Sequence, residues 1–153
     1  YPLDKLVDMY ERSVGHNSTL ILGVTPDTNG LLPEADVRRL QELGREIRRT
    51  FSNPIGKTAG SGYEIELRFN DDAEFDTVVI QEEIQYGERV RAYDLQILQD
   101  GAWHPLAKGT CIGHKRIHRL ARKRALAIRL TIHRTTGLPL IKQLAIYYSK
   151  GSK

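Results

Sequence analysis

"NSTLILGVTPDTNGLLPEADVRRLQELG" (residues 17–44) contains the pattern that decides the fold. Its apolar run at 18–24 has the length of a strand and does not alternate, which is typical of a strand covered on both faces, as in parallel sheets. The turn-forming sequence PDTNG follows at 26–30, and residues 33–51 then repeat apolar side chains at helical spacing. The stretch therefore predicts one strand–helix unit of a parallel α/β fold.

A further helix is predicted before this strand, over residues 2–14. Its apolar residues recur at helical spacing, Pro2 lies near the first helical position, and Gly15 marks the end. In the later helix, acidic residues follow Pro33 in the first turn and arginines fill the last turn, which complements the helix dipole. Residues 1–51 are therefore expected to form a helix–strand–helix unit.

The rest of the chain has a different, β-rich pattern. Residues 52–62 (SNPIGKTAGSG) are rich in Ser, Gly, Pro and Asn, so we expect a linker there. Short β-rich segments follow, with turn sequences about every 8–12 residues, which is typical of an antiparallel sandwich. Seven strands are predicted, at 63–69, 75–82, 89–98, 102–107, 111–120, 125–133 and 140–148. The chain is therefore expected to be mainly β, with an antiparallel β-sandwich domain over residues 63–153.

Composition places few limits on function. No apolar run approaches the roughly 20 residues that a membrane-spanning helix needs, so no membrane span is expected. The single cysteine, Cys111, excludes an intrachain disulfide. The first ten residues lack the basic and apolar regions of a signal peptide, so none is expected at this start.

The charges are distributed unevenly along the chain. All 19 Asp and Glu lie in residues 1–100, whereas residues 101–153 hold 12 of the 23 Lys and Arg and no acid. Such asymmetry is compatible with a nucleic-acid or other anionic partner. It also arises when neighbouring strands of one sandwich carry opposite charges that meet across the sheet, and this is the explanation we favour.

The most basic stretch, HKRIHRLARKR at 114–124, has no aromatic residues for base stacking and no helix-turn-helix or zinc pattern, so no nucleic-acid partner is expected. His114 and His118 are four residues apart, which is about 13 Å along a strand and too far for one small ion. No metal site and no cofactor are expected. The carboxylate pairs Asp71-Asp72 and Glu82-Glu83 are interpreted as structural or solvated.

Four residues are candidates for carbohydrate binding. Trp103 is the only tryptophan, and an exposed indole ring can stack on the CH groups of a sugar. A Trp just after a hairpin turn can equally be a core or rim residue of the sandwich. Its neighbour His104, and Lys115 and Arg116 from the basic stretch, complete the candidate set.

Residues 17–44 resemble the last barrel strand and helix of glycoside hydrolase family 29, the α-L-fucosidases. The family pattern there is Asn-x-x-Leu-Leu, then Pro, then Asp-x-x-Gly-x-(Ile/Leu)-Pro and an amphipathic helix that ends at Gly. The matching residues are Asn17, Leu20, Ile21, Pro26, Asp27, Gly30, Leu32, Pro33 and Gly44. The segments EFDTVVIQEEIQYGERVRAYDLQI, WHPLAKGTCIGHKRIHRL and ALAIRL are similar to the family's C-terminal galactose-binding-like sandwich, so the resemblance covers nearly the whole chain.

The resemblance implies a fold and an activity. The fold is the end of a (β/α)8 catalytic barrel followed by a galactose-binding-like jelly roll. The activity is retaining hydrolysis of fucosylated glycans, and the EADV helix start is similar to the branch that favours α-1,3/1,4 linkages. The family's Asp nucleophile and Glu acid/base lie on earlier barrel segments, so no catalytic residue is expected in this chain. Asp27 could line the cleft, although a turn-forming role is favoured. The resemblance also implies secretion or export to the periplasm.

Three hypotheses for function follow. In the first, the chain is the C-terminal part of an α-L-fucosidase, its sandwich supports the barrel, and the remainder of that barrel is its partner. In the second it is a carbohydrate-binding module, and in the third it binds an anionic polymer through its basic half. One strand with two helices lacks the neighbours that would complete its ladder and cover it. The chain alone is therefore expected to be inactive as a fucosidase.

Overall fold

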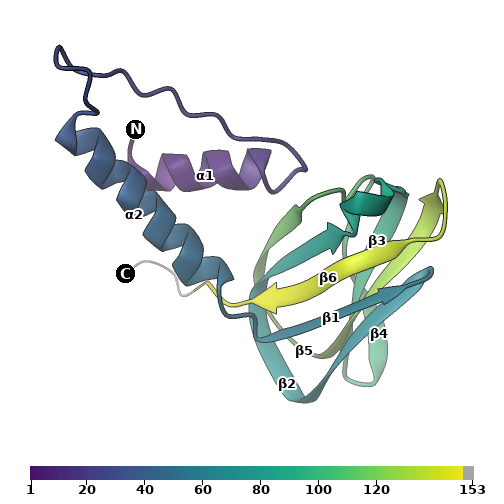
Figure 1. Cartoon of the computed structure of the whole chain (residues 1–153). Helices are drawn as coiled ribbons and strands as arrows, with labels where there is room; N and C mark the ends of the chain where they lie inside the picture. The colour runs from purple at the N-terminus through teal and green to yellow at the C-terminus, as the bar shows by residue number, and fades with distance from the viewer. Residues whose placement is uncertain (150–153) are drawn as a thin grey trace.

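A computed structural model describes residues 1–149 of the chain, with two helices projecting from one side of a β-sandwich (Figure 1). The helices are α1 (Leu3–Ser13) and α2 (Glu34–Phe51). The remaining elements are β1 (Gly56–Ser61), β2 (Glu64–Glu82), the short 3-10 helix η1 (Ile84–Tyr86), β3 (Val90–Gln99), β4 (Ala102–Gly109), β5 (Arg116–Thr135) and β6 (Leu140–Tyr147). Neither helix of the described part is long and apolar enough to span a membrane.

The strands form one antiparallel sheet in the order β1-β6-β2-β5-β3-β4, which folds over on itself. The end of β2 (77–82) pairs with β6, and its residues 77–80 pair with β5 as well, whereas the first part of β2 (64–75) pairs with β5 alone. β5 pairs in turn with β3, so β2 and β5 run through both layers. Side chains from the two layers share one apolar core. The predicted β-sandwich preceded by helices is confirmed.

Two of the predicted strand breaks are wrong. Residues 64–69 and 75–82 belong to the single strand β2, and residues 116–120 join 125–133 in β5. The ladder is interrupted instead by bulges, where residues 69–72 face a single residue of β5. A bulge bends a strand without ending its pairing, and this bend lets one strand serve both layers.

Part of the predicted linker is a strand. Residues 56–61 form β1, which pairs with β6 at the edge of the sheet. Backbone hydrogen bonds are sufficient to hold an edge strand, so its Gly-rich composition does not prevent pairing. Gly56 is required by close packing, because a Cβ there would lie 2.8 Å from the ring of Phe69. The division of the chain into two domains stays a prediction.

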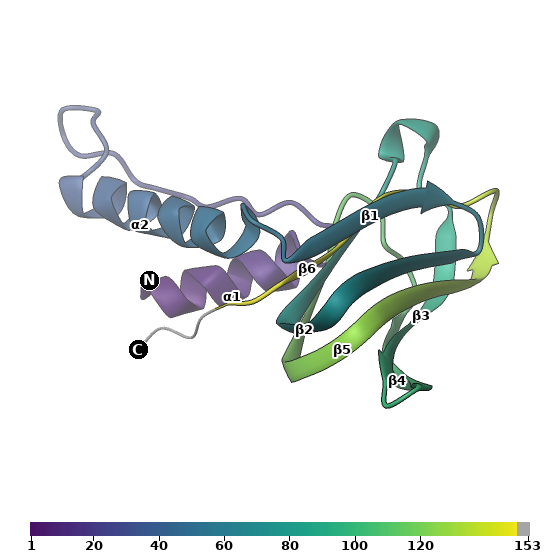
Figure 2. The same cartoon turned by 90° about the horizontal axis from the view of Figure 1, so that it is seen from below.

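The strand expected at 18–24 has no ladder in the structure. The segment is extended and runs unpaired beside the two helices (Figures 1 and 2). Its side chains alternate in exposure: Leu22 and Val24 are half-buried, whereas Ile21 is 87% exposed. One face therefore packs on the helices while the other face and both edges are bare. A strand of a parallel sheet needs neighbours on both sides, and residues 1–149 do not supply them.

A second, smaller apolar cluster joins the helices to the sandwich. Ile117 and Tyr147 contribute to it from the sheet, and Tyr10 and Phe51 pack against it from the helices. The Phe51 ring centroid lies 6.1 Å from that of Tyr10 and 5.6 Å from that of Tyr147. The two parts of the chain are therefore in direct, partly aromatic contact.

Candidate functional site

The four carbohydrate-binding candidates do not form one site. Trp103 and His104 lie at the start of β4, whereas Lys115 and Arg116 follow the loop after its end. Gly109 lies six residue steps beyond Trp103 along the extended strand, which is roughly 20 Å. The structure therefore places two separate pairs at opposite ends of β4, and a single small sugar does not span them.

One face of the Trp103 ring is occupied by a cation. The guanidinium carbon of Arg129 lies 4.0 Å from the ring centroid, a cation–π geometry. Gln96 fixes this guanidinium, since its Oε1 accepts hydrogen bonds from Arg129 Nε at 3.1 Å and Nη2 at 2.6 Å. His104 beside the ring is exposed. A sugar that stacked on this face of Trp103 would have to displace Arg129.

Lys115 serves the contact with α1. Its Nζ lies 3.3 Å from the hydroxyl of Tyr10, and the two form a hydrogen bond. Arg116 forms an isolated β-bridge with His16, also from the helical part of the chain. Both residues are half-buried there. They are therefore part of the junction between the helices and the sandwich, and they do not line an open binding surface.

Asp27 shapes a turn. Its Oδ1 accepts hydrogen bonds from the backbone N–H of Asn29 at 2.8 Å and of Leu31 at 3.0 Å. Its own N–H donates to the carbonyl of Leu31 at 2.8 Å. This is the Asx-type role that the sequence favours. Because the side-chain Oδ1 and the backbone N–H of Asp27 are both hydrogen-bonded within the loop, Asp27 is held in place by its own turn.

Glu82 is the most buried carboxylate of the described residues, at 2% exposure. Its Oε1 accepts hydrogen bonds from the N–H groups of Arg89 at 2.8 Å and Val90 at 3.0 Å, and its Oε2 accepts one from Gly113 at 2.7 Å. The interpretation of this acid as structural fits these contacts, because three backbone donors occupy it. The burial of Glu82 could be predicted from the sequence, because side chains two residues apart in a strand point to the same face and Glu82 follows the buried Val78 and Ile80 at this spacing.

A buried pair, Tyr93 and His118, lies inside the sandwich near this end. The Tyr93 hydroxyl and His118 Nε2 are 2.8 Å apart and hydrogen-bonded. Burial lowers the pKa of His118 to about 4, and the charge of Arg116 acts in the same direction. Burial raises the pKa of Tyr93 to about 12. Both groups are therefore neutral near pH 7.

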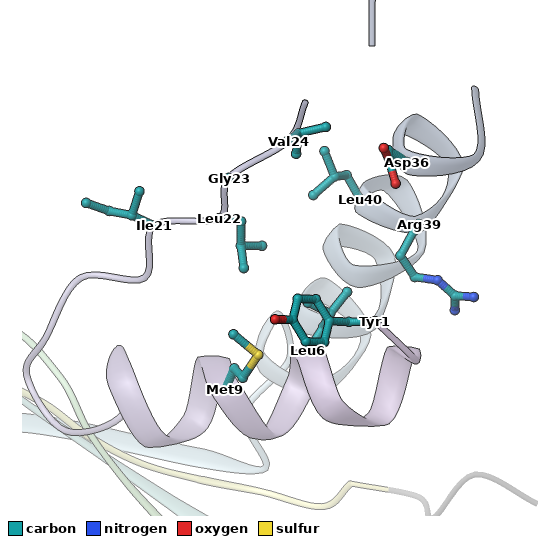
Figure 3. Close-up of a pocket in the computed structure, with 10 residues that line it drawn as sticks. All are labelled: Tyr1, Leu6, Met9, Ile21, Leu22, Gly23, Val24, Asp36, Arg39 and Leu40. Carbon is teal, nitrogen blue, oxygen red and sulfur yellow. The ribbon is translucent and has the colours of Figure 1, made fainter. Parts of the chain in front are cut away.

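A cavity of about 240 Å³ lies between α1, α2 and the extended segment 18–24 (Figure 3). Leu6 and Met9 of α1, Leu40 of α2, and Leu22 and Val24 of the segment contribute its apolar lining. The polar groups at its rim are few, and no pair of carboxylates faces across it. The cavity therefore lacks the groups for hydrolysis and has the character of an incompletely filled core.

The basic half of the chain meets the acidic half across the sheet. Arg122 Nε lies 2.6 Å from Glu74 Oε1, and Arg124 approaches the same carboxylate. Arg119 bonds to Glu11 of α1 and also lies near Asp76. The favoured explanation of the uneven charge is confirmed for the pairs with Glu74 and Asp76, which join the neighbouring strands β5 and β2, whereas Glu11 belongs to α1. Within residues 1–149, no group of three His, Cys, Asp or Glu side chains is arranged to hold a metal ion.

Comparison with known proteins confirms the resemblance that the sequence suggests. No protein-family model matches the chain. The crystal structure of a "putative alpha-L-fucosidase" from Bacteroides thetaiotaomicron superposes with a TM-score of 0.94 and 43% identity over 98% of this chain and 35% of that one. The GH29 fucosidase of Ruminococcus gnavus in complex with fucose gives a TM-score of 0.85 at 28% identity, over 98% of this chain and 37% of its own.

A curated sequence agrees with these structures. Alpha-L-fucosidase 1 of Arabidopsis thaliana is 25% identical over 99% of this chain and 37% of its own length. The chain thus spans about a third of the relatives that it matches. Its similarity to α-L-fucosidases extends over both the helices and the sandwich.

Proposed function

We propose that the chain is the C-terminal part of a retaining α-L-fucosidase, to which it contributes the last strand and helix of the catalytic barrel and a supporting β-sandwich. The single observation that carries this proposal is the 43% identity and near-complete superposition on a fucosidase structure about three times as long. Fucosylated glycans are the proposed substrates of the whole enzyme, with α-1,3/1,4 linkages as the finer expectation from the EADV helix start.

The bare face of residues 18–24 supports a missing barrel as the partner. Ile21 is 87% exposed and in Figure 3 points to the opposite side from Leu22, whose side chain turns toward the helices. Leu31 and Leu32 in the following loop are also exposed. Exposing apolar side chains of an unpaired strand to water is unfavourable in free energy, and neighbouring barrel strands would cover them.

The position of the sandwich supports a scaffolding role. The sandwich touches the helical part near Asn17, where the extended segment begins, and near the end of α2. The loop that joins the segment to α2 lies far from the sandwich in both views (Figures 1 and 2). Catalytic groups of a (β/α)8 barrel lie at the C-terminal ends of its strands. The sandwich would therefore hold the barrel from the end opposite to the chemistry.

The purified 153-residue chain is expected to release no nitrophenol from nitrophenyl α-L-fucoside above the buffer rate. Retaining hydrolysis needs two carboxyl groups about 5–5.5 Å apart. Asp27 and Glu82 are engaged in a turn and in backbone hydrogen bonds, and Glu11, Glu74 and Asp76 lie beside arginines. An active family 29 fucosidase assayed at the same molar concentration is the positive control. Turnover that rises in proportion to chain concentration and survives repeated purification would contradict the proposal.

Carbohydrate binding by the sandwich is the second candidate function, and the observation that favours it is a half-buried Trp103 on the outer side of the sheet. Because Trp103 is the only tryptophan, its fluorescence reports on that site alone. With Arg129 on the ring, we expect no saturable change on titration with fucosides or galactosides. Saturable quenching in the parent chain, together with a calorimetric binding signal that is lost in Trp103→Phe, would favour the binding module instead.

A further inference from the structure

Two loops of the sandwich close around a single side chain of the helical part. The amide of Asn17 bonds to both: its Oδ1 accepts a hydrogen bond from the N–H of His114 at 2.7 Å, and its Nδ2 donates to Glu88 Oε1 at 3.0 Å. Its backbone N–H donates to the carbonyl of Lys115 at 2.9 Å. Residues 87–90 and 111–115 are therefore tied together through Asn17.

The same two loops are tied a second time through Glu82. One carboxylate oxygen accepts the N–H groups of Arg89 and Val90, and the other accepts that of Gly113. The hydrogen bonds thus form a closed circuit: Asn17 bonds to loops 87–90 and 111–115, and each of these loops bonds in turn to Glu82. We call this set (Asn17, Glu82, Glu88, Gly113 and His114) the Asn17 latch.

The backbone of the latch is shaped for an asparagine. Asn17 has φ 60°, a left-handed conformation that Asn tolerates better than most residues. Gly113 also has φ 60°, and a Cβ on it would lie 2.2 Å from Cγ of Asn17. The glycine therefore allows the amide of Asn17 to lie directly against the loop. Beside the latch, the N–H of Ile117 donates to the carbonyl of Gly15 at 2.8 Å.

We propose that the Asn17 latch is the docking device by which the sandwich fixes the position of residues 18–24, with Asn17 as the positioning residue. Asn17 immediately precedes this segment, which has no ladder of its own in the described structure. The polar groups of the latch are hydrogen-bonded to one another, so the two loops hold the start of the segment in place. The identity of 18–24 as a barrel strand rests on the proposed function, whereas the latch can be tested in this chain.

Amide hydrogen exchange of the full chain provides the first test, with Asn17→Gly as the variant because glycine keeps the left-handed backbone accessible. The amides of Arg89, Val90 and Ile117 do not bond to the Asn17 side chain. If the circuit acts as a unit, they are expected to exchange at least about tenfold faster in the variant. The amide of Ile132, which donates to the carbonyl of Tyr63 elsewhere in the sandwich, should change less than about twofold.

The position of the segment is tested by spin labels on Thr25→Cys and on Lys142→Cys, an exposed position of β6 outside the latch, with the exposed Cys111 replaced by Ser. The distribution of distances between the labels is expected to broaden about twofold or more in Asn17→Gly, because the latch no longer holds the start of the segment. Asn29→Ala, in the loop at 27–32 and outside the latch, is the matched control and should leave both readouts unchanged.

A donor–acceptor swap distinguishes positioning from a general structural effect. In Asn17→Asp, two carboxylates face each other where Asn17 Nδ2 donates to Glu88 in the parent chain, so the latch should loosen. Adding Glu88→Gln places an amide donor opposite the new carboxylate and so restores the hydrogen bond in the reverse direction. The double variant is expected to return the distance distribution to the parent width. Unchanged exchange at Arg89, Val90 and Ile117 in Asn17→Gly, or acceleration at Ile132 to the same extent, would overturn the proposal. These results do not depend on fucosidase activity.

Discussion

Glu82→Ala is expected to lower the free energy of unfolding by at least about 3 kcal/mol. The substitution removes both acceptor oxygens and leaves three backbone N–H groups, of Arg89, Val90 and Gly113, without partners in a site where Glu82 is 2% exposed. Each buried donor left unsatisfied costs about 1–3 kcal/mol. Urea unfolding followed by circular dichroism measures the loss.

The neighbouring Glu83→Ala is the matched control for this prediction. Glu83 is next along the chain and its side chain is half-buried, but its recorded hydrogen bonds are made by the backbone. A change within about 0.5 kcal/mol is expected for it. Glu82→Gln should fall between the two variants, because the amide keeps one acceptor oxygen and presents a donor to another donor. A loss below about 1 kcal/mol in Glu82→Ala would show that the loops find other partners.

Acidification from pH 7 to pH 5 is expected to cost the folded chain about 2 kcal/mol through His118 alone. Burial lowers the pKa of this imidazole to about 4 in the folded state, against an ordinary value of 6.5. Below pH 6.5 the unfolded chain therefore binds a proton at His118 that the folded chain does not bind. The contribution to stability is fully present above pH 6.5 and is lost as the pH falls toward 4.

His118→Gln isolates this contribution. Glutamine can keep a hydrogen bond to the Tyr93 hydroxyl and does not titrate, so the difference between the unfolding free energies at pH 7 and pH 5 should shrink by about 2 kcal/mol. His104→Gln, on the exposed side of β4, is the control and should retain the parent pH dependence. An equal pH dependence in His118→Gln and the parent chain would mean that His118 is already protonated in the folded state at pH 5.

The elements that the sequence predicts well are those whose signal is local. Alternation over 89–98 gives β3 within one residue, and the apolar stripe over 33–51 gives α2 equally closely. The Asn-Asp-Asp sequence at 70–72 is typical of a turn, yet it forms a bulge. Turn and bulge share composition, and the difference lies in whether the strand continues its pairing with a distant partner.

The errors at the candidate site have a similar origin. Trp103 and Lys115 are twelve residues apart in sequence, but the direction of β4 between them places them at opposite ends of a strand. The role of Asn17 depends on loops that lie more than 70 residues away in sequence. Glu82 could have been identified as a buried acid, because it lies at the same two-residue spacing as the inward-facing Val78 and Ile80. The apolar run at 18–24 predicts a covered strand, but pairing also requires neighbouring strands, and residues 1–149 supply none for it.

A small rotation at the contact between the helices and the sandwich would move the far end of α2 by a much larger distance. The contacts described there involve Tyr10, Asn17 and Phe51, at one end of the helical part. α2 extends from this joint for 18 residues, about 27 Å, toward the loop at 27–32. A rotation of about 10° at the joint would move that loop by roughly 5 Å over a helix of this length. Stiffness at the joint therefore sets how accurately the far end is placed, and substitutions there would alter geometry at residues that they never touch.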